Sequence, residues 1–90
     1  MGASNFWYLM KTQEISSVMW LLYEWGKSWY GLKKLSKFTG LPMNKINWVL
    51  NKMEKEDYVK VFTIFDNGRQ LKGFFLSDET RERLRDLDNK

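Results

Sequence analysis

Residues 25–53 carry lysines and no carboxylates. The charged side chains of this stretch are Lys27, Lys33, Lys34, Lys37, Lys45 and Lys52, and neither Asp nor Glu occurs among them. A surface with one sign of charge attracts a partner of the opposite sign, and the phosphates of DNA are the first candidate. A solvated lysine-rich face is the alternative explanation. The formal net charge of +4 over 90 residues fits both.

Amide and guanidinium side chains in and after this stretch have the chemistry to read bases. Asn44 and Asn47 each carry the donor and acceptor that match the exposed edge of adenine, and Lys45 suits guanine or a phosphate. Arg69, in a predicted turn at residues 66–69, fits a narrow and negatively charged minor groove. Simple solvation is the alternative for these side chains. Phosphate contacts, which set affinity and register without reading sequence, are expected from Lys33, Lys34, Lys37 and Lys52.

The chain is poorly supplied with groups for other chemistry. It contains no His and no Cys, which removes the commonest general base, the commonest metal ligand and the thiolate nucleophile. A glycine loop that could cradle a phosphate is also lacking. The acidic residues Asp57, Asp66, Asp78 and Glu79 have no ligand-like spacing. We therefore expect no enzyme, no metal site and no cofactor.

Length and apolar runs set the expected organisation and location. Ninety residues suit one domain, which we predict at residues 12–90 behind an N-terminal arm at residues 1–11. No apolar run approaches the ~18–20 residues needed to cross a bilayer, and the start of the chain lacks the features of a signal peptide. Together with the absence of Cys, this predicts a cytoplasmic protein without a membrane partner.

Apolar spacing predicts three helices in the first part of the domain. The first covers residues 12–26, the second residues 32–38 and the third residues 42–55. Gly40 is free to take a positive φ after the second helix, and Pro42 suits the first turn of the third. The inward-facing positions are Ile15, Val18, Met19, Leu22, Leu32, Leu35, Ile46, Val49, Leu50 and Met53.

The second part of the chain reads as a hairpin followed by a helix. β-Branched and aromatic residues at 58–65 predict a strand, Asn67-Gly68 is the strongest short hairpin signal, and residues 70–76 form the return strand. Ser77 is a good N-cap for a last helix over residues 78–87. Apolar residues occur on both faces of the hairpin, which indicates that one face is covered.

This order of elements resembles the winged helix-turn-helix family, which includes MarR-like regulators. The resemblance covers about residues 16–84. The position before Tyr58 is usually Gly in that family and is Asp57 here. The residues that carry the resemblance are Leu32, Leu35, Thr39-Gly40-Leu41, Ile46, Leu50, Met53-Glu54, Tyr58-Val59, Asp66, Arg69 and Leu76-Ser77. It implies an α+β fold with a three-helix core and a two-stranded wing, to which this chain adds an apolar N-terminal arm and a C-terminal helix.

The resemblance also implies a function. In the family, the helix after the turn enters the major groove, and the wing reaches the minor groove or the backbone. The chain would then be a sequence-specific transcriptional regulator that binds double-stranded DNA. Its recognition helix, at about 42–55, would contribute Met43, Asn44, Lys45, Asn47, Trp48, Asn51 and Lys52. Its wing, at about 58–76, would contribute Asn67, Gly68, Arg69 and Lys72.

The expected partners include a second copy of the chain. One module of this size buries little surface for tight specific binding, so we expect a homodimer with half-sites about one helical turn apart. Trp20 projects away from the apolar stripe of its helix and needs cover from residues 6–10 or from a second subunit. The N-terminal arm with Trp20, or the C-terminal helix, would supply the dimer interface through Phe6, Trp7, Trp20, Leu84 and Leu87.

An alternative function follows from Trp48. Aromatic residues are enriched at protein interfaces, and a Trp on the outer face of the third helix suits a protein partner as well as DNA. In that case the chain is a winged-helix protein-interaction module of a replication or transcription assembly.

Overall fold

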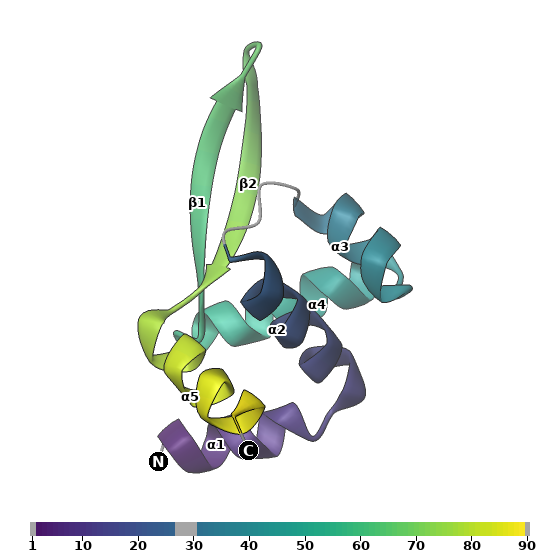
Figure 1. Cartoon of the computed structure of the whole chain (residues 1–90). Helices are drawn as coiled ribbons and strands as arrows, with labels where there is room; N and C mark the ends of the chain where they lie inside the picture. The colour runs from purple at the N-terminus through teal and green to yellow at the C-terminus, as the bar shows by residue number, and fades with distance from the viewer. Residues whose placement is uncertain (1, 27–30, 90) are drawn as a thin grey trace.

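The computed structural model describes residues 2–26 and 31–89. Four helices come first: α1 (Gly2–Met10), α2 (Gln13–Trp25), α3 (Gly31–Thr39) and α4 (Met43–Lys55). The antiparallel strands β1 (Val59–Asp66) and β2 (Arg69–Leu76) follow, and then helix α5 (Asp78–Asp88). The helices form a body from which the hairpin projects, with α1 and α5 at the opposite end (Figure 1). The molecule is an α+β globule, as predicted.

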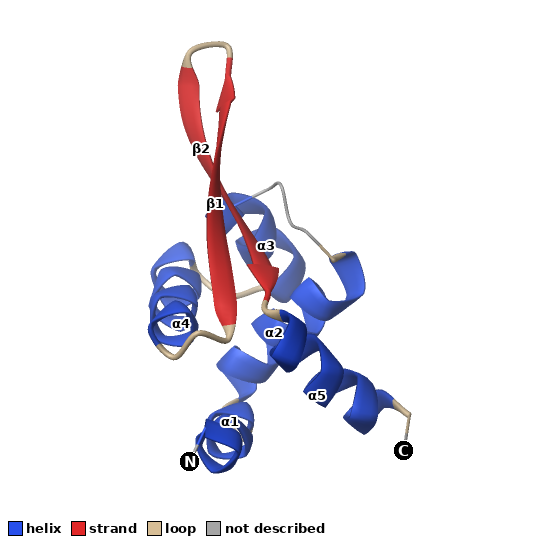
Figure 2. Ribbon diagram, turned by 90° about the vertical axis from the view of Figure 1, so that its left-hand side faces the viewer, coloured by secondary structure: helices blue, strands red, loops and turns tan. Residues whose placement is uncertain are grey.

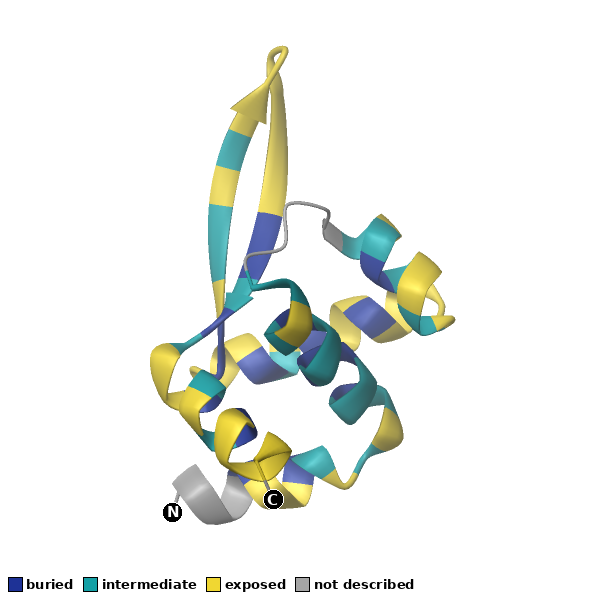
Figure 3. Ribbon diagram, in the orientation of Figure 1, coloured by how far each residue is buried: buried dark blue, intermediate teal, exposed yellow. Residues whose placement is uncertain are grey.

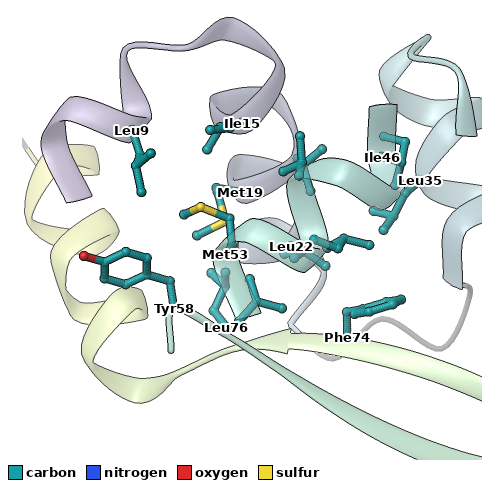
Figure 4. Packing of buried hydrophobic residues seen from close by; sticks show 14 of the residues in the cluster. Leu9, Ile15, Met19, Leu22, Leu35, Ile46, Met53, Tyr58, Phe74 and Leu76 are labelled. Carbon is teal, nitrogen blue, oxygen red and sulfur yellow. The ribbon is translucent and has the colours of Figure 1, made fainter. Parts of the chain in front are cut away.

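The core lies where α2, α3, α4 and the base of the hairpin meet (Figure 4). Helical spacing explains which side chains enter it, because residues three and four apart share one face of a helix. The inward positions predicted for these helices are buried, except Leu32, which packs partly buried at the edge. The hairpin contributes Val59, Phe74 and Leu76. The covered face of the hairpin is therefore the one that carries these three residues.

Helix α1 belongs to the same core. The prediction for residues 6–10 left a helix and an arm open, and the segment is helical. Phe6 is fully buried and its ring meets Tyr58 edge-on at 5.0 Å, while Leu9 is also buried. Leu84 of α5 is fully buried as well. The prediction that Phe6 and Leu84 contribute to a dimer interface is therefore wrong, because the monomer itself encloses both side chains.

Side-chain hydrogen bonds fix the turn between α3 and α4. Gly40 takes φ +77° and its N–H donates to the Ser36 carbonyl, which confirms the predicted helix end. The Ser36 hydroxyl donates to the Leu41 carbonyl, and the Thr39 hydroxyl accepts from the Leu41 N–H. Pro42 stands just before α4, where its carbonyl accepts the first N–H bonds of the helix. These bonds set the angle at which α4 leaves α3.

The hairpin is regular from end to end. Its register runs from Val59 opposite Leu76 to Asp66 opposite Arg69. Asn67 and Gly68 both take positive φ, which is the geometry of a two-residue turn that matches the twist of the strands. The predicted Asn-Gly turn is therefore confirmed. Burial is confined to the half nearest the helices, and the distal half is largely exposed on both strands (Figure 3).

Main-chain hydrogen bonds join the hairpin base to the helices on both sides. The Tyr58 N–H donates to the Met53 carbonyl at the end of α4, at 2.9 Å, and the Ser77 N–H donates to the Tyr58 carbonyl at 3.0 Å. The Ser77 hydroxyl accepts the Thr80 N–H, which confirms it as the N-cap of α5. The guanidinium of Arg81 donates to the Tyr23 carbonyl and so ties α5 to α2. Helices α4 and α5 thus lie on opposite sides of the hairpin base (Figure 2).

Asp57 has the backbone conformation that glycine favours. Its φ is +65°, at the position where the family that the sequence resembles usually has Gly. A left-handed residue with a Cβ is strained by about 1 kcal/mol or more, a strain that Asp tolerates better than Ala. We expect Asp57→Gly to exceed Asp57→Ala in free energy of unfolding by about 1 kcal/mol in urea titrations. Equal stability of the two variants would contradict this assignment.

Candidate nucleic-acid interface

The outer face of α4 points away from the core. Ile46, Val49, Leu50 and Met53 occupy the inner face of this helix, so the side chains between them face solvent. The exposed residues of the predicted recognition helix are Met43, Asn44, Lys45, Asn47, Trp48 and Asn51, and Lys52 is half-buried. The prediction that these residues lie on the outside of the third helix is confirmed.

A groove of about 560 Å³ lies between α3, α4 and the hairpin. Its apolar lining comes from Leu32, Val61, Leu71 and Phe74. Its polar lining comes from Lys33 of α3, from Asn47, Asn51 and Glu54 of α4, and from Gln70 and Lys72 of β2. The fold therefore brings together four side chains that were predicted to contact DNA from three different elements: Lys33, Asn47, Asn51 and Lys72.

The charges in this groove are mixed but mainly positive. Lys33 and Lys72 come from its two walls, on α3 and on the hairpin, and both are exposed. Asn47 and Asn51 are one helical turn apart on α4. Their amides supply hydrogen-bond donors and acceptors in the same groove. Glu54 follows on the same face of α4 and adds a negative charge at the end of the row. An anionic chain in the groove would meet two ammonium groups and one carboxylate.

A second hollow of about 600 Å³ lies beside Trp48 on α4. It is lined by Trp48, Asn51, Lys52, Glu54 and Lys55. The ammonium of Lys45 lies 5.8 Å from the centre of the Trp48 ring, within the range of a cation–π contact. Asn51 and Glu54 line both this hollow and the groove. The two openings therefore adjoin along α4.

The remaining predicted lysines of α3 have other surroundings. The ammonium of Lys34 lies over the rings of Trp25 and Phe38, at 6.0 and 5.8 Å from their centres. Those two rings meet edge-on at 5.2 Å, so Trp25 of α2 packs against Phe38 of α3. Lys37 is exposed in the last turn of α3. Neither Lys34 nor Lys37 lines the groove beside α4.

The predicted wing residues divide between the groove and the hairpin end. Lys72 faces the groove, whereas Asn67, Gly68 and Arg69 form the exposed turn that projects beyond the helices (Figure 1). In the strand register, Arg69 of β2 lies opposite Asp66 of β1 at the hairpin end. The fold therefore does not gather the turn residues with the side chains of α4.

Three polar lining residues, Gln70, Lys55 and Glu54, were not among the predicted site residues, although two of them follow from simple spacing. Gln70 is two residues before Lys72, so both belong to one face of β2. Lys55 is four residues after Asn51, which puts both on one face of α4. The third, Glu54, is acidic and so lies outside the pattern of basic and amide side chains that predicts DNA contacts.

The other predicted dimer residues differ in exposure. Trp7 and Leu87 are exposed on α1 and α5. Trp20 is half-buried, with its ring edge-on to Tyr23 at 5.5 Å and beside a hollow that Phe38 and Thr39 also line. A dimer interface through Trp7, Trp20 and Leu87 stays a prediction.

Within residues 2–26 and 31–89, no three His, Cys, Asp or Glu side chains are grouped so that they could hold a metal ion. None of the helices described has both the length and the apolar character to cross a membrane. Comparison with protein-family models, curated proteins and solved structures finds no match to this chain.

Proposed function

We propose that this chain is a winged helix-turn-helix protein that binds double-stranded DNA in the cytoplasm and regulates transcription in a sequence-specific manner. Helix α4 acts as the recognition helix and the hairpin acts as the wing. The observation that carries the proposal is the groove in which Lys33, Asn47, Asn51 and Lys72 come together from α3, α4 and β2. Binding, and no catalysis, is the proposed activity.

The dimensions of α4 suit a major groove. Its 13 residues span about 20 Å at 1.5 Å per residue, and the major groove of B-DNA, about 12 Å wide, admits one helix. With α4 in the groove, the phosphate strand beside it lies between α4 and the hairpin. Lys33 and Lys72 then contact phosphates, and the amides of Asn44 and Asn47 face base edges.

The wing extends this contact along the duplex. Each strand has eight residues and is about 26 Å long at 3.3 Å per residue. Arg69 at the end of the wing carries a guanidinium that suits a narrow minor groove. This minor groove adjoins the major groove that α4 enters. Trp7, Trp20 and Leu87 would supply the homodimer interface, and contact through Trp7 and Leu87 would leave both wings accessible, because α1 and α5 lie at the other end of the body (Figure 1).

Exposed apolar side chains favour a second candidate function. Phe38 is 57% exposed, Trp48 is 48% exposed and Met43 is also exposed, all on α3 and α4. Apolar side chains of this size are enriched where proteins meet. A winged-helix module that binds another protein in a replication or transcription assembly is therefore the alternative.

Salt dependence separates the two functions. We expect the affinity for a fluorescent duplex, measured by anisotropy, to fall linearly on a log–log plot of binding constant against salt. The slope should be about −4, which corresponds to four or five phosphate contacts. Enrichment of particular sequences from a pool of random duplexes would show specificity. A slope near zero would exclude the DNA proposal and favour the protein-interaction module.

A further inference from the structure

We propose that the hollow beside Trp48 takes a nucleobase that is unpaired, either in a single strand or extruded from a duplex. This inference rests on the proposed function, because it specifies the form of nucleic acid that α4 binds best. Trp48 is 48% exposed in the middle of the outer face of α4. A large indole in that position can offer a partner a flat apolar surface.

An intact duplex offers such a surface little to stack on, because its major groove presents only the thymine methyl group to an apolar side chain. Within the stack, the faces of the bases cover one another, and the major groove presents only their edges. Hydrogen-bonding groups read those edges, whereas an aromatic ring gains most by stacking on the face of a base that has left the stack. Trp48 therefore favours a nucleic acid in which at least one base is accessible from its face.

The surroundings of Trp48 supply the rest of a nucleotide site. The hollow is open to solvent along one side of α4, so the face of the indole is accessible from it. Lys52 and Lys55 line it and suit flanking phosphates, and the amide of Asn51 offers a donor and an acceptor to the edge of a base. Lys45, 5.8 Å from the ring centre, adds a further positive charge on the other side along the helix.

Glu54 favours a base over a phosphate as the occupant of the hollow. Its carboxylate lines the hollow and repels a phosphate, but it accepts a hydrogen bond from the amino group of cytosine, adenine or guanine. Because Asn51 and Glu54 also line the groove, a strand with its backbone between α4 and the wing could turn one base into the hollow. A base with an exocyclic amino group is the expected occupant.

Three labelled probes of one sequence test the proposal with the full chain. They are an intact duplex, the same duplex with one central unpaired adenine, and the single strand. We expect the wild-type protein to bind the duplex with the unpaired adenine most tightly of the three probes. Trp48→Ala should weaken the binding of the two probes with unpaired bases about 5- to 150-fold, which is the effect of losing one stacked base, and should weaken intact-duplex binding less. Trp48→Phe should retain most of the preference.

Tyr8→Ala is the matched control, because Tyr8 is 72% exposed on α1 at the opposite end of the body. It should bind all three probes like the wild type. If Trp48→Ala loses affinity equally for all three probes, the inference is overturned. Equal affinity of the wild type for the intact and the interrupted duplex would also overturn it. Salt-independent, weak binding of every probe would instead refute the proposed DNA function itself. The two failures are therefore distinguishable.

Discussion

Replacing Phe6 by alanine is expected to lower the free energy of unfolding by about 3–5 kcal/mol. Phe6 is fully buried, its ring meets the Tyr58 ring edge-on, and the guanidinium carbon of Arg83 lies 5.5 Å from its centre. The side chain thus holds α1 against the start of the hairpin and against α5. Alanine would leave a cavity among all three, and the total stability of a domain is only about 5–15 kcal/mol.

Urea or thermal unfolding followed by circular dichroism measures this effect. For a domain of this size the melting temperature should fall by about 15–30 °C. Tyr8→Ala, on the exposed side of the same helix, should change the free energy of unfolding by no more than about 0.5 kcal/mol. A loss below about 1 kcal/mol in Phe6→Ala would mean that α1 is a detachable arm, as the sequence alone allowed.

The double variant Lys33→Ala/Lys72→Ala is expected to lose most of the affinity for duplex DNA. Both lysines line the groove, from α3 and from β2. Removing two phosphate contacts should reduce the log–log salt slope by about two and the affinity by about 10- to 100-fold at about 0.1 M salt. Anisotropy titrations at several salt concentrations measure both quantities.

The matched control for charge is Lys11→Ala/Arg85→Ala, because both side chains are exposed and lie outside the groove. It removes the same number of positive charges. If the phosphates bind in the groove, the log–log salt slope of this control should equal that of the wild type. Glu54→Gln should act in the opposite direction and strengthen binding, since it removes the carboxylate from the groove. If the control loses as much affinity as the groove variant, binding reflects net charge alone.

Local patterns in the sequence were sufficient for most of the fold. The buried positions of α2 and α4 follow from helical periodicity, since residues at i, i+3, i+4 and i+7 share a face. Gly40 and the Asn67-Gly68 pair mark chain reversals that need positive φ. Ser77 marks the start of α5 through its hydroxyl. Each of these signals involves residues that are close in sequence. They can therefore be recognised without knowledge of the tertiary structure.

Features that depend on distant residues were not predictable in the same way. The pattern of residues 6–10 is apolar throughout, so it could not show that Phe6 would be enclosed by Tyr58 and that Leu84 would be buried as well. The outward face of α4 followed from periodicity. The placement of Lys33 and Lys72 along one groove did not, because it depends on the angle between the hairpin and the helices.

The hydrogen bonds at the hairpin base have a thermodynamic consequence. Because Tyr58 joins the end of α4 on one side and Ser77 on the other, the hairpin and α4 cannot hinge independently at that point. The spacing of α4 and the hairpin is therefore preorganised at the base, and a partner that enters between them loses little conformational entropy there. Adaptation to different partners is left to the distal half of the hairpin, which few neighbours restrain.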